Sequence, residues 1–141
     1  MSEEENLALV RKVYDLWNDR DLDGALDLAT DDVEIKLVAL GQTLTGRDGF
    51  RRFMERFARA SSDMKKDITN QVASAEQVVS EFTLIGTHDG PLRTTSGKIA
   101  PTGKAIELEV VEVIGIRDGK VATIRNYSDT ATLMRQLGLS E

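Results

Sequence analysis

Residues 105–116 read Ala-Ile-Glu-Leu-Glu-Val-Val-Glu-Val-Ile-Gly-Ile, and they predict a long β-strand around which the rest of the chain is organised. Alternate residues of a strand point to opposite faces of its sheet. One face is apolar except for a single carboxyl group, and it carries Ile106, Leu108, Val110, Glu112, Ile114 and Ile116. The other face is mixed, with Glu107, Glu109, Val111, Val113 and Gly115. The first face is expected to line the interior, which makes Glu112 its exceptional residue.

Glu112 is the strongest clue to chemistry in the sequence. An unpaired carboxylate is costly to bury among apolar side chains, yet burial is also how proteins adjust a carboxyl group for proton transfer. Two interpretations follow. Glu112 is either a general base on the floor of a small-molecule pocket or a member of a salt bridge at a subunit interface, because structural networks also bury acids.

The composition restricts the classes of function. The chain has 141 residues, a formal net charge of −6, one histidine and no cysteine. Its length predicts one domain, residues 1–141, and its negative charge argues against nucleic-acid and anionic-membrane partners. The scarcity of histidine and cysteine predicts no metal site, and the motifs predict no cofactor. An acidic start without an apolar segment favours a cytoplasmic protein.

The remaining periodicity predicts an α+β fold. Helices are expected over residues 6–17, 22–29, 48–60 and 129–137, with strands over 33–40, 64–75, 78–88, 105–116 and 121–127. Turns are expected at 41–46 and 117–120, and residues 89–102 form a loop or a wide hairpin connection. Helices packed on the concave face of a curved, mostly antiparallel (mixed) sheet would form a cone whose mouth is a natural small-molecule pocket.

The helix predicted over residues 48–60 has two contrasting sides. Three phenylalanines, Phe50, Phe53 and Phe57, recur on one side at helical spacing. The other side carries the arginines Arg51, Arg52, Arg56 and Arg59. This basic side is either an anion or partner site or a solvated helix face, and the overall acidity of the chain favours the solvated face.

Five short strings, spread in order along nearly the whole chain, resemble those of the SnoaL-like polyketide cyclases in the nuclear transport factor 2-like superfamily. They are Leu16-Trp17-Asn18-Asp19-Arg20-Asp21-Leu22, Gly86-Thr87-His88-Asp89-Gly90-Pro91, Pro101-Thr102-Gly103-Lys104, Asp118-Gly119-Lys120-Val121 and Gln136-Leu137-Gly138. The resemblance implies a cofactor-free aldol ring closure of a polyketide ester. An acid/base residue removes a proton next to one carbonyl group, and the enolate attacks another.

The resemblance also implies where the acid/base residue would lie. In the family, an Asp of the last strand acts beside a His of the preceding strand. Counting back from residues 136–138 places the Asp position at Asn126 and the His position at Glu112, whereas a register different by one residue would select Arg125 or Tyr127. An Asn side chain orients a substrate but cannot take its proton. Either the acid/base role has moved to Glu112, or the cyclase chemistry is lost.

The expected catalytic set is Glu112, Asn126 and His88. Asn126 shares a strand face with Ile124, and we expect it near Glu112 across the strand pair, one or two rungs from directly opposite. His88 is the only histidine. It is interpreted either as a proton shuttle or as an exposed side chain at the end of a strand.

The expected substrate-binding wall is largely aromatic and aliphatic: Tyr14, Trp17, Phe53, Phe57, Phe82, Leu108 and Ile124. Tyr14 either donates a hydrogen bond to an oxyanion or belongs to the core. Asp129 corresponds to an acid common in the family but also fits a helix cap.

Two classes of function remain open, beside a scaffold-only protein whose collapsed interior would have no pocket. The first is a cyclase, isomerase or hydrolase acting on a small apolar or polyketide-like ligand. The second is a non-catalytic binding or assembly domain on the same fold. In either case a homodimer is predicted, because Val111 and Val113 make the outer face of the sheet half-apolar and because the family resemblance implies one.

Overall fold

The structure, a computed structural model that describes residues 2–139, is built on one six-stranded sheet. Its strands are β1 (Ala29–Leu37), β2 (Gln42–Thr45), β3 (Lys65–Ala73), β4 (Gln77–Thr87), β7 (Ala105–Arg117) and β8 (Lys120–Ser128). They lie in the order β2-β1-β8-β7-β4-β3. The β1–β8 pair is parallel and the other pairs are antiparallel, so the sheet is mixed.

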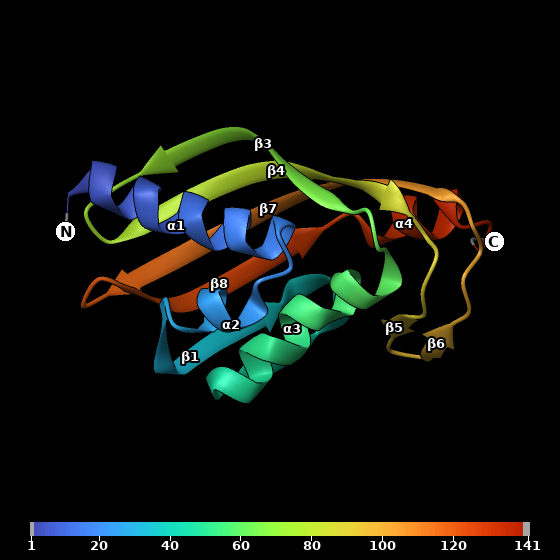
Figure 1. Ribbon diagram of the computed structural model, residues 1–141, viewed down its shortest axis with the longest axis horizontal. Coiled ribbons are helices and arrows are strands. Elements are labelled where there is room, and N and C mark those ends of the chain that lie inside the picture. Colours follow the sequence, from blue (N-terminus) through green and yellow to red (C-terminus); the bar gives the residue numbers. More distant parts are fainter. Residues whose placement is uncertain (1, 140–141) are drawn as a thin grey trace.

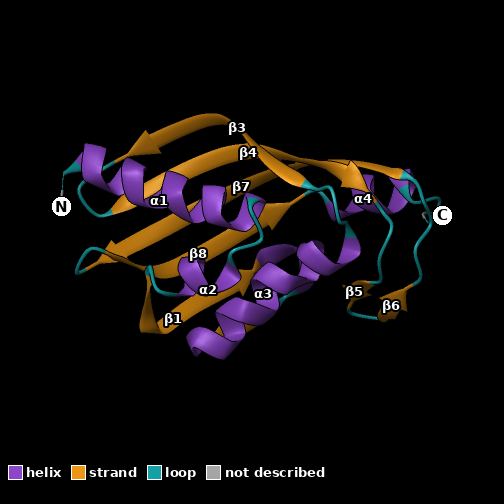
Figure 2. Ribbon diagram, in the orientation of Figure 1, coloured by secondary structure: helices purple, strands orange, loops and turns teal. Residues whose placement is uncertain are grey.

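The helices are α1 (Glu3–Asn18), α2 (Leu22–Leu26), α3 (Gly46–Ala60) and α4 (Thr130–Gln136), with a 3-10 turn, η1, at Val38–Leu40. Figures 1 and 2 show α1, α2 and α3 crossing one face of the curved sheet, with α4 at the far end. A separate hairpin, β5 (Leu92–Thr94) and β6 (Gly97–Ile99), lies at that same end. The predicted α+β fold, a curved mixed sheet with helices packed on it, is therefore confirmed.

Side-chain hydrogen bonds cap the N-termini of α1 and α4. At the start of α1 the Ser2 hydroxyl accepts from the Glu5 backbone N–H at 3.1 Å, while the Glu5 carboxylate accepts from the Ser2 N–H at 3.1 Å. This reciprocal capping box satisfies two donors that the helix leaves free. At the start of α4 the Asp129 carboxylate accepts from the Thr132 N–H at 3.1 Å. Asp129 is thus the helix cap that its position suggested.

Strand β7 has the alternation that the sequence predicts. Every second residue from Ile106 to Ile114 is buried, and the residues between them are exposed or half-buried. The turn to β8 places Asp118 at φ 54° and Gly119 at φ 73°, the positive values that a tight two-residue hairpin needs. The β7–β8 register shifts between Gly115 and Ile116. The irregularity leaves Ile116 half-buried.

Residues 38–40, predicted as the end of a strand, form the 3-10 turn η1. Two strand assignments also differ from the prediction. Strand β1 begins at Ala29, which belongs to the predicted second helix, because Ala29 pairs with Val121 of β8. Residues 42–45, predicted as part of a turn, instead form β2 and pair with residues 34–37 of β1. Both differences arise from pairing between strands, which local periodicity does not contain. No helix within residues 2–139 has the length and apolarity to cross a membrane.

Candidate active site

Glu112 lies in the middle of β7 and is only 1 % exposed. Its Oε1 accepts a hydrogen bond from the Tyr14 hydroxyl, and its Oε2 accepts one from the Asn126 side-chain amide, each at 2.8 Å. The ion pairs formed among residues 2–139 do not include Glu112. Two neutral donors therefore hold the carboxylate, where a salt bridge was the alternative expectation.

Asn126 reaches Glu112 because the two residues are direct cross-strand partners in the β7–β8 register. The sequence placed them one or two rungs apart, so the actual approach is closer than expected. The neighbours Arg125 and Tyr127 are exposed on the opposite face. Asn126 is thus the residue of this part of β8 that can act with Glu112.

Helix α1 supplies the second donor, Tyr14, which is 1 % exposed. Burial, and then the adjacent Glu112 carboxylate, raise the pKa of Tyr14 well above its ordinary value. The phenol therefore keeps its proton and donates a hydrogen bond to Glu112. Tyr14 also packs against Phe82 with ring centroids 5.2 Å apart, so it serves the core and the site together.

Lys66 is a site residue that the sequence analysis missed. Its Nζ lies 4.9 Å from the ring centroid of Tyr14, 4.7 Å from that of Trp17 and 5.3 Å from that of Phe82. Aromatic faces attract a cation at such distances. The available signal was the strand alternation around Lys65 and Lys66, since Lys65 is exposed and Lys66 is half-buried on the inward face.

The backbone of Lys66 is fixed by the end of α1. Asn18 Oδ1 accepts from the Lys66 N–H at 2.8 Å, and Asn18 Nδ2 donates to the Lys66 carbonyl oxygen at 3.1 Å. Burial lowers the pKa of Lys66; the Glu112 carboxylate opposes that shift and Arg20 adds to it. Lys66 thus forms no ion pair within residues 2–139, although it lines the same pocket as the candidate base Glu112.

A pocket opens beside Glu112 between the sheet and α3. The centres of water molecules can occupy about 30 Å³ of its interior. Six of the predicted site residues line it: Trp17, Phe53, Phe57, Phe82, Glu112 and Asn126. A space of that inner size holds about two waters, so a larger ligand requires side chains to move.

The other predicted wall residues have different places. Tyr14 and Ile124 line a smaller adjoining pocket that shares Glu112 with the first. Leu108 lies in the core, fully buried, and lines neither pocket. Of the residues that the sequence did not select, Arg56 and Lys66 both line the main pocket.

His88 lies apart from Glu112, and neither pocket includes it. It is fully buried, so it is not the exposed strand-end side chain that one interpretation expected. Its Nδ1 accepts a hydrogen bond from the Thr102 backbone N–H at 3.2 Å. The backbone N–H of His88 donates to the Lys104 carbonyl oxygen at 2.8 Å. These contacts fasten the loop before β7 to the end of β4. Within residues 2–139, no group of three or more acidic or histidine side chains is placed to hold a metal ion.

Replacing Lys66 with Met is expected to stabilise the protein at pH 7. Because folding lowers the pKa of Lys66 from its ordinary 10.5, the unfolded chain binds the proton more readily. The native state therefore loses stability as pH falls through the folded pKa, and the loss is absent above pH 10.5. Thermal unfolding of Lys66→Met and wild type at pH 7 and pH 10 would measure a gain that shrinks at the higher pH. A less stable Met variant, or a pH-independent difference, would contradict this expectation.

The model of the SnoaL-like polyketide cyclase family matches residues 7–137 of the chain. No curated protein sequence matches this chain significantly. The family match covers every residue of the pocket described above, from Trp17 to Ser128.

Solved structures provide a similar fold. A proposed SnoaL-like polyketide cyclase from Jannaschia sp. CCS1 aligns with a TM-score of 0.83 at 19% identity, over 99% of this chain and 95% of that one. AclR, a proposed hydroxylase from Streptomyces galilaeus, aligns with a TM-score of 0.85 at 23% identity, over 99% and 89%. A proposed ketosteroid isomerase from Kribbella flavida DSM 17836 aligns with a TM-score of 0.69 at 20% identity, over 90% and 79%. At these identities the likeness establishes the fold alone.

Proposed function

Because this chain belongs to the SnoaL-like polyketide cyclase family, we propose that it performs cofactor-independent acid/base chemistry on an apolar carbonyl substrate, of the intramolecular aldol type. The observation that carries the proposal is the buried Glu112 carboxylate, which lines a largely apolar pocket. Glu112 is the acidic residue of that pocket, since its other polar wall residues are Arg56, Lys66, Asn126 and Ser128.

In the proposed reaction Glu112 acts as the general base. It takes a proton from the carbon beside a carbonyl group, while Tyr14 and Asn126 hold the carboxylate in place through their hydrogen bonds. The Lys66 ammonium stabilises the negative charge that develops on the enolate oxygen. The enolate carbon then attacks the second carbonyl group. The proton held by Glu112 passes to the alkoxide that forms, so the carboxylate is regenerated.

The cross-strand geometry supports a move of the acid/base role from position 126 to position 112. The family resemblance puts an Asp where this chain has Asn126. Since Asn126 and Glu112 are direct partners on neighbouring strands, a carboxyl group on either strand faces the same pocket. Exchanging the acid between the two strands therefore preserves its place relative to a ligand.

The second candidate is a non-catalytic binding domain. The observation that favours it is the small interior space, about 30 Å³ for the centres of water molecules, together with the two donors that already occupy Glu112. In that case Glu112 and Asn126 would only hold a ligand or a partner chain.

Deuterium exchange at carbon separates the two functions. Phenylalkyl ketones such as 4-phenylbutan-2-one, and a panel of β-keto esters, would be incubated with the protein in D₂O and followed by NMR. We expect saturable deuterium incorporation next to the carbonyl group, above the buffer rate. Ring-closed product is expected only from esters that carry a further ketone group far enough along the chain to form a ring. Ligand binding without exchange or product would support the binding domain instead.

The homodimer and the cytoplasmic location also stay predictions. The outer face of the sheet carries the half-buried Val111 and Val113. Tyr127, the cross-strand partner of Val111, is 42 % exposed, and Val72, beyond β4 on the same face, is 61 % exposed. Burying such apolar surface favours association. Sedimentation velocity should find the mass of two chains, and a strictly monomeric protein at micromolar concentration would rule the homodimer out.

A further inference from the structure

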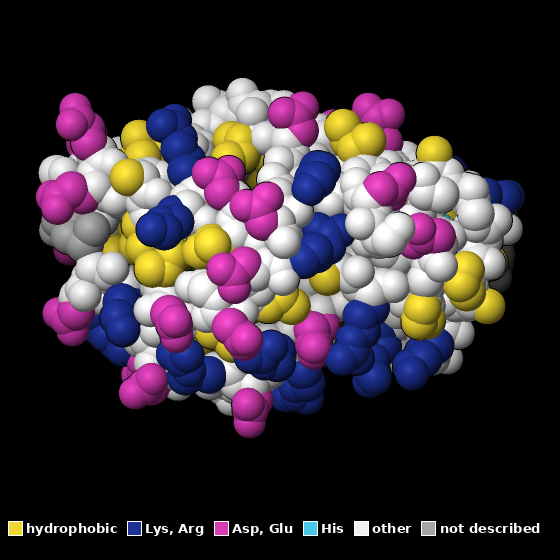
Figure 3. Space-filling view, in the orientation of Figure 1, with side chains coloured by type: hydrophobic (Ala, Val, Ile, Leu, Met, Phe, Trp, Pro, Cys, Tyr) yellow, Lys and Arg dark blue, Asp and Glu magenta, His cyan; other side chains and the backbone are white. Residues whose placement is uncertain are grey.

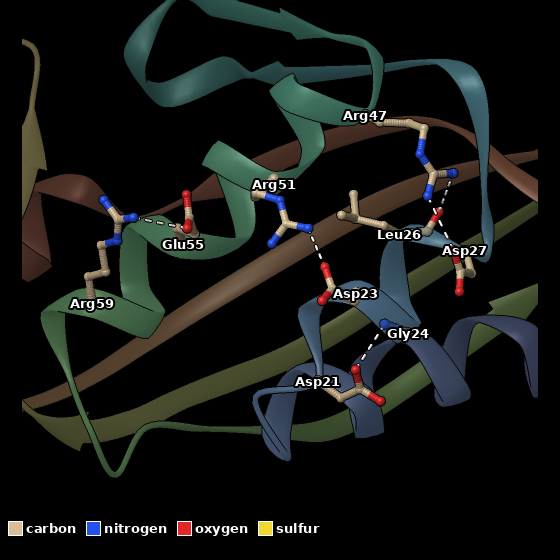
Figure 4. Close-up of polar contacts among 9 residues, drawn as sticks. All are labelled: Asp21, Asp23, Gly24, Leu26, Asp27, Arg47, Arg51, Glu55 and Arg59. Carbon is tan, nitrogen blue, oxygen red and sulfur yellow. Dashed lines mark hydrogen bonds and ion pairs between the residues drawn. The ribbon is translucent and has the colours of Figure 1, made fainter.

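The arginines of helix α3 differ in their acidic partners. Figure 4 shows Arg47 beside Asp27, Arg51 against Asp23, and Arg59 against Glu55 of the same helix. Arg52 and Arg56 are absent from the ion pairs within residues 2–139. Arg52 is exposed, whereas Arg56 is half-buried. Figure 3 shows the resulting mixture of basic and acidic side chains over α3, so most of this face is the solvated one that the acidity of the chain suggested.

Arg56 differs from the paired arginines because it lines the main pocket. Its Nε donates to the Arg93 carbonyl oxygen at 2.9 Å, and its Cζ lies 4.8 Å from the ring centroid of Phe57. Its Nη1 and Nη2 have no hydrogen-bond partner in the described part of the chain. Burial lowers the pKa of Arg56 to about 10, with no carboxylate opposing the shift. Arg56 therefore carries its charge at neutral pH and has two nitrogens available.

The charges of the pocket do not cancel. Arg56 and Lys66 contribute two basic groups, and Glu112 contributes the one acidic group. Glu112 already accepts hydrogen bonds from Tyr14 and Asn126. Within residues 2–139 the Arg56 guanidinium has no acidic partner, so an anion that binds there gains charge-assisted hydrogen bonds. The excess of basic groups is notable in a chain whose net charge is −6.

We propose that Arg56 anchors a carboxylate of the ligand, so that the pocket takes an apolar acid carrying a carbonyl group. This inference deepens the proposed function, on which its catalytic meaning rests, by naming the substrate class. Guanidinium groups bind carboxylates through two parallel N–H···O bonds, which fix orientation as well as position. Arg56 belongs to the helical layer and Glu112 to the sheet, and both line the same pocket. A carboxylate on Arg56 thus directs the rest of the ligand along Phe53 and Phe57 toward Glu112.

Matched probes test this anchor without any turnover. The acid 4-phenylbutanoate and its neutral amide, 4-phenylbutanamide, differ in charge and little in shape, and their dissociation constants at pH 7 would be measured by titration NMR. We expect wild type to bind the acid about 10- to 100-fold more tightly, the range for a charge-assisted pair. Arg56→Gln should lose this preference while binding the amide as before. Arg52→Gln, on the same helix but exposed, should keep it.

The possible outcomes are distinct. Equal binding of acid and amide by wild type overturns the anchor, and so does the absence of saturable binding of either probe. If Arg56→Gln weakens both probes equally, Arg56 only supports the pocket wall. A preference lost in Lys66→Met but kept in Arg56→Gln assigns the anion to Lys66 instead. Arg56→Lys retains the charge and should keep part of the preference, which preserves the test if the Gln variant does not fold. Absence of deuterium exchange alongside a retained acid preference would reject the proposed reaction but not the anchor.

Discussion

Replacing Glu112 with Gln is expected to lower kcat/KM for enolisation by about 10²- to 10⁴-fold, the usual contribution of a general base. Gln has the shape of Glu but cannot take the substrate proton. Its side-chain oxygen can still accept from Tyr14, as the Glu112 carboxylate does at 2.8 Å. The measurement is the rate of deuterium incorporation into 4-phenylbutan-2-one, beside thermal unfolding to show that the variant is folded.

Glu107→Gln provides the matched control for this substitution. Glu107 lies on the same strand, β7, but its side chain is exposed on the opposite face. Its removal should leave the exchange rate within about twofold, because surface substitutions rarely perturb a distant site. A folded Glu112→Gln variant that keeps more than a tenth of the wild-type rate would show that another group removes the proton.

The second large effect concerns Asn126→Asp, which restores the acid that the family resemblance puts at this position. The Asn126 amide donates to Glu112 at 2.8 Å, so the variant brings two carboxyl groups together. They cannot both ionise at that separation, and the pair retains a proton with a raised pKa. A raised pKa in the folded state supports stability below the unfolded pKa of about 4 and loses that support as pH rises.

Asn126→Asp should therefore resemble wild type near pH 4 and be about 1–3 kcal/mol less stable at pH 8. Urea unfolding of both proteins at pH 4, 6 and 8 measures the difference at each pH. Asn126→Leu is the uncharged control, since it removes the donor without adding a carboxyl group, and its deficit should not grow with pH as steeply. A pH-independent deficit in the Asp variant would mean that the two carboxyl groups avoid each other.

Part of the candidate site could be predicted from the sequence, but the contacts between its residues could not. Glu112 was accessible from the sequence because a strand alternates with period two, and one acid among apolar residues is visible in a single stretch. Its partners Tyr14 and Asn126 were both candidates, but nothing in their local sequence says that they meet at one carboxylate. Lys66 was overlooked because β3 is polar on its exposed side, and one inward lysine does not disturb that pattern.

The sequence likewise does not predict which partner each arginine of α3 contacts. Helical spacing separates the phenylalanines from most of the arginines, but it does not predict that Arg56 lines the same pocket as Phe53 and Phe57. It cannot distinguish Arg51, which meets Asp23 of α2, from Arg56, which turns to the pocket. That distinction depends on which elements pack beside each turn of the helix. The same holds for β2, whose pairing partner lies outside its own segment.

By itself, then, the sequence determined the fold class, the hairpin at Asp118-Gly119 and the inward position of Glu112, because all three depend on the periodicity and turn preferences of neighbouring residues. Only the tertiary structure decided that Asn126 opposes Glu112, that Lys66 and Arg56 enter the pocket, and that His88 fastens a loop instead of joining the site. These arrangements depend on strand register and on contacts between segments far apart in the chain, and no local pattern encodes such contacts.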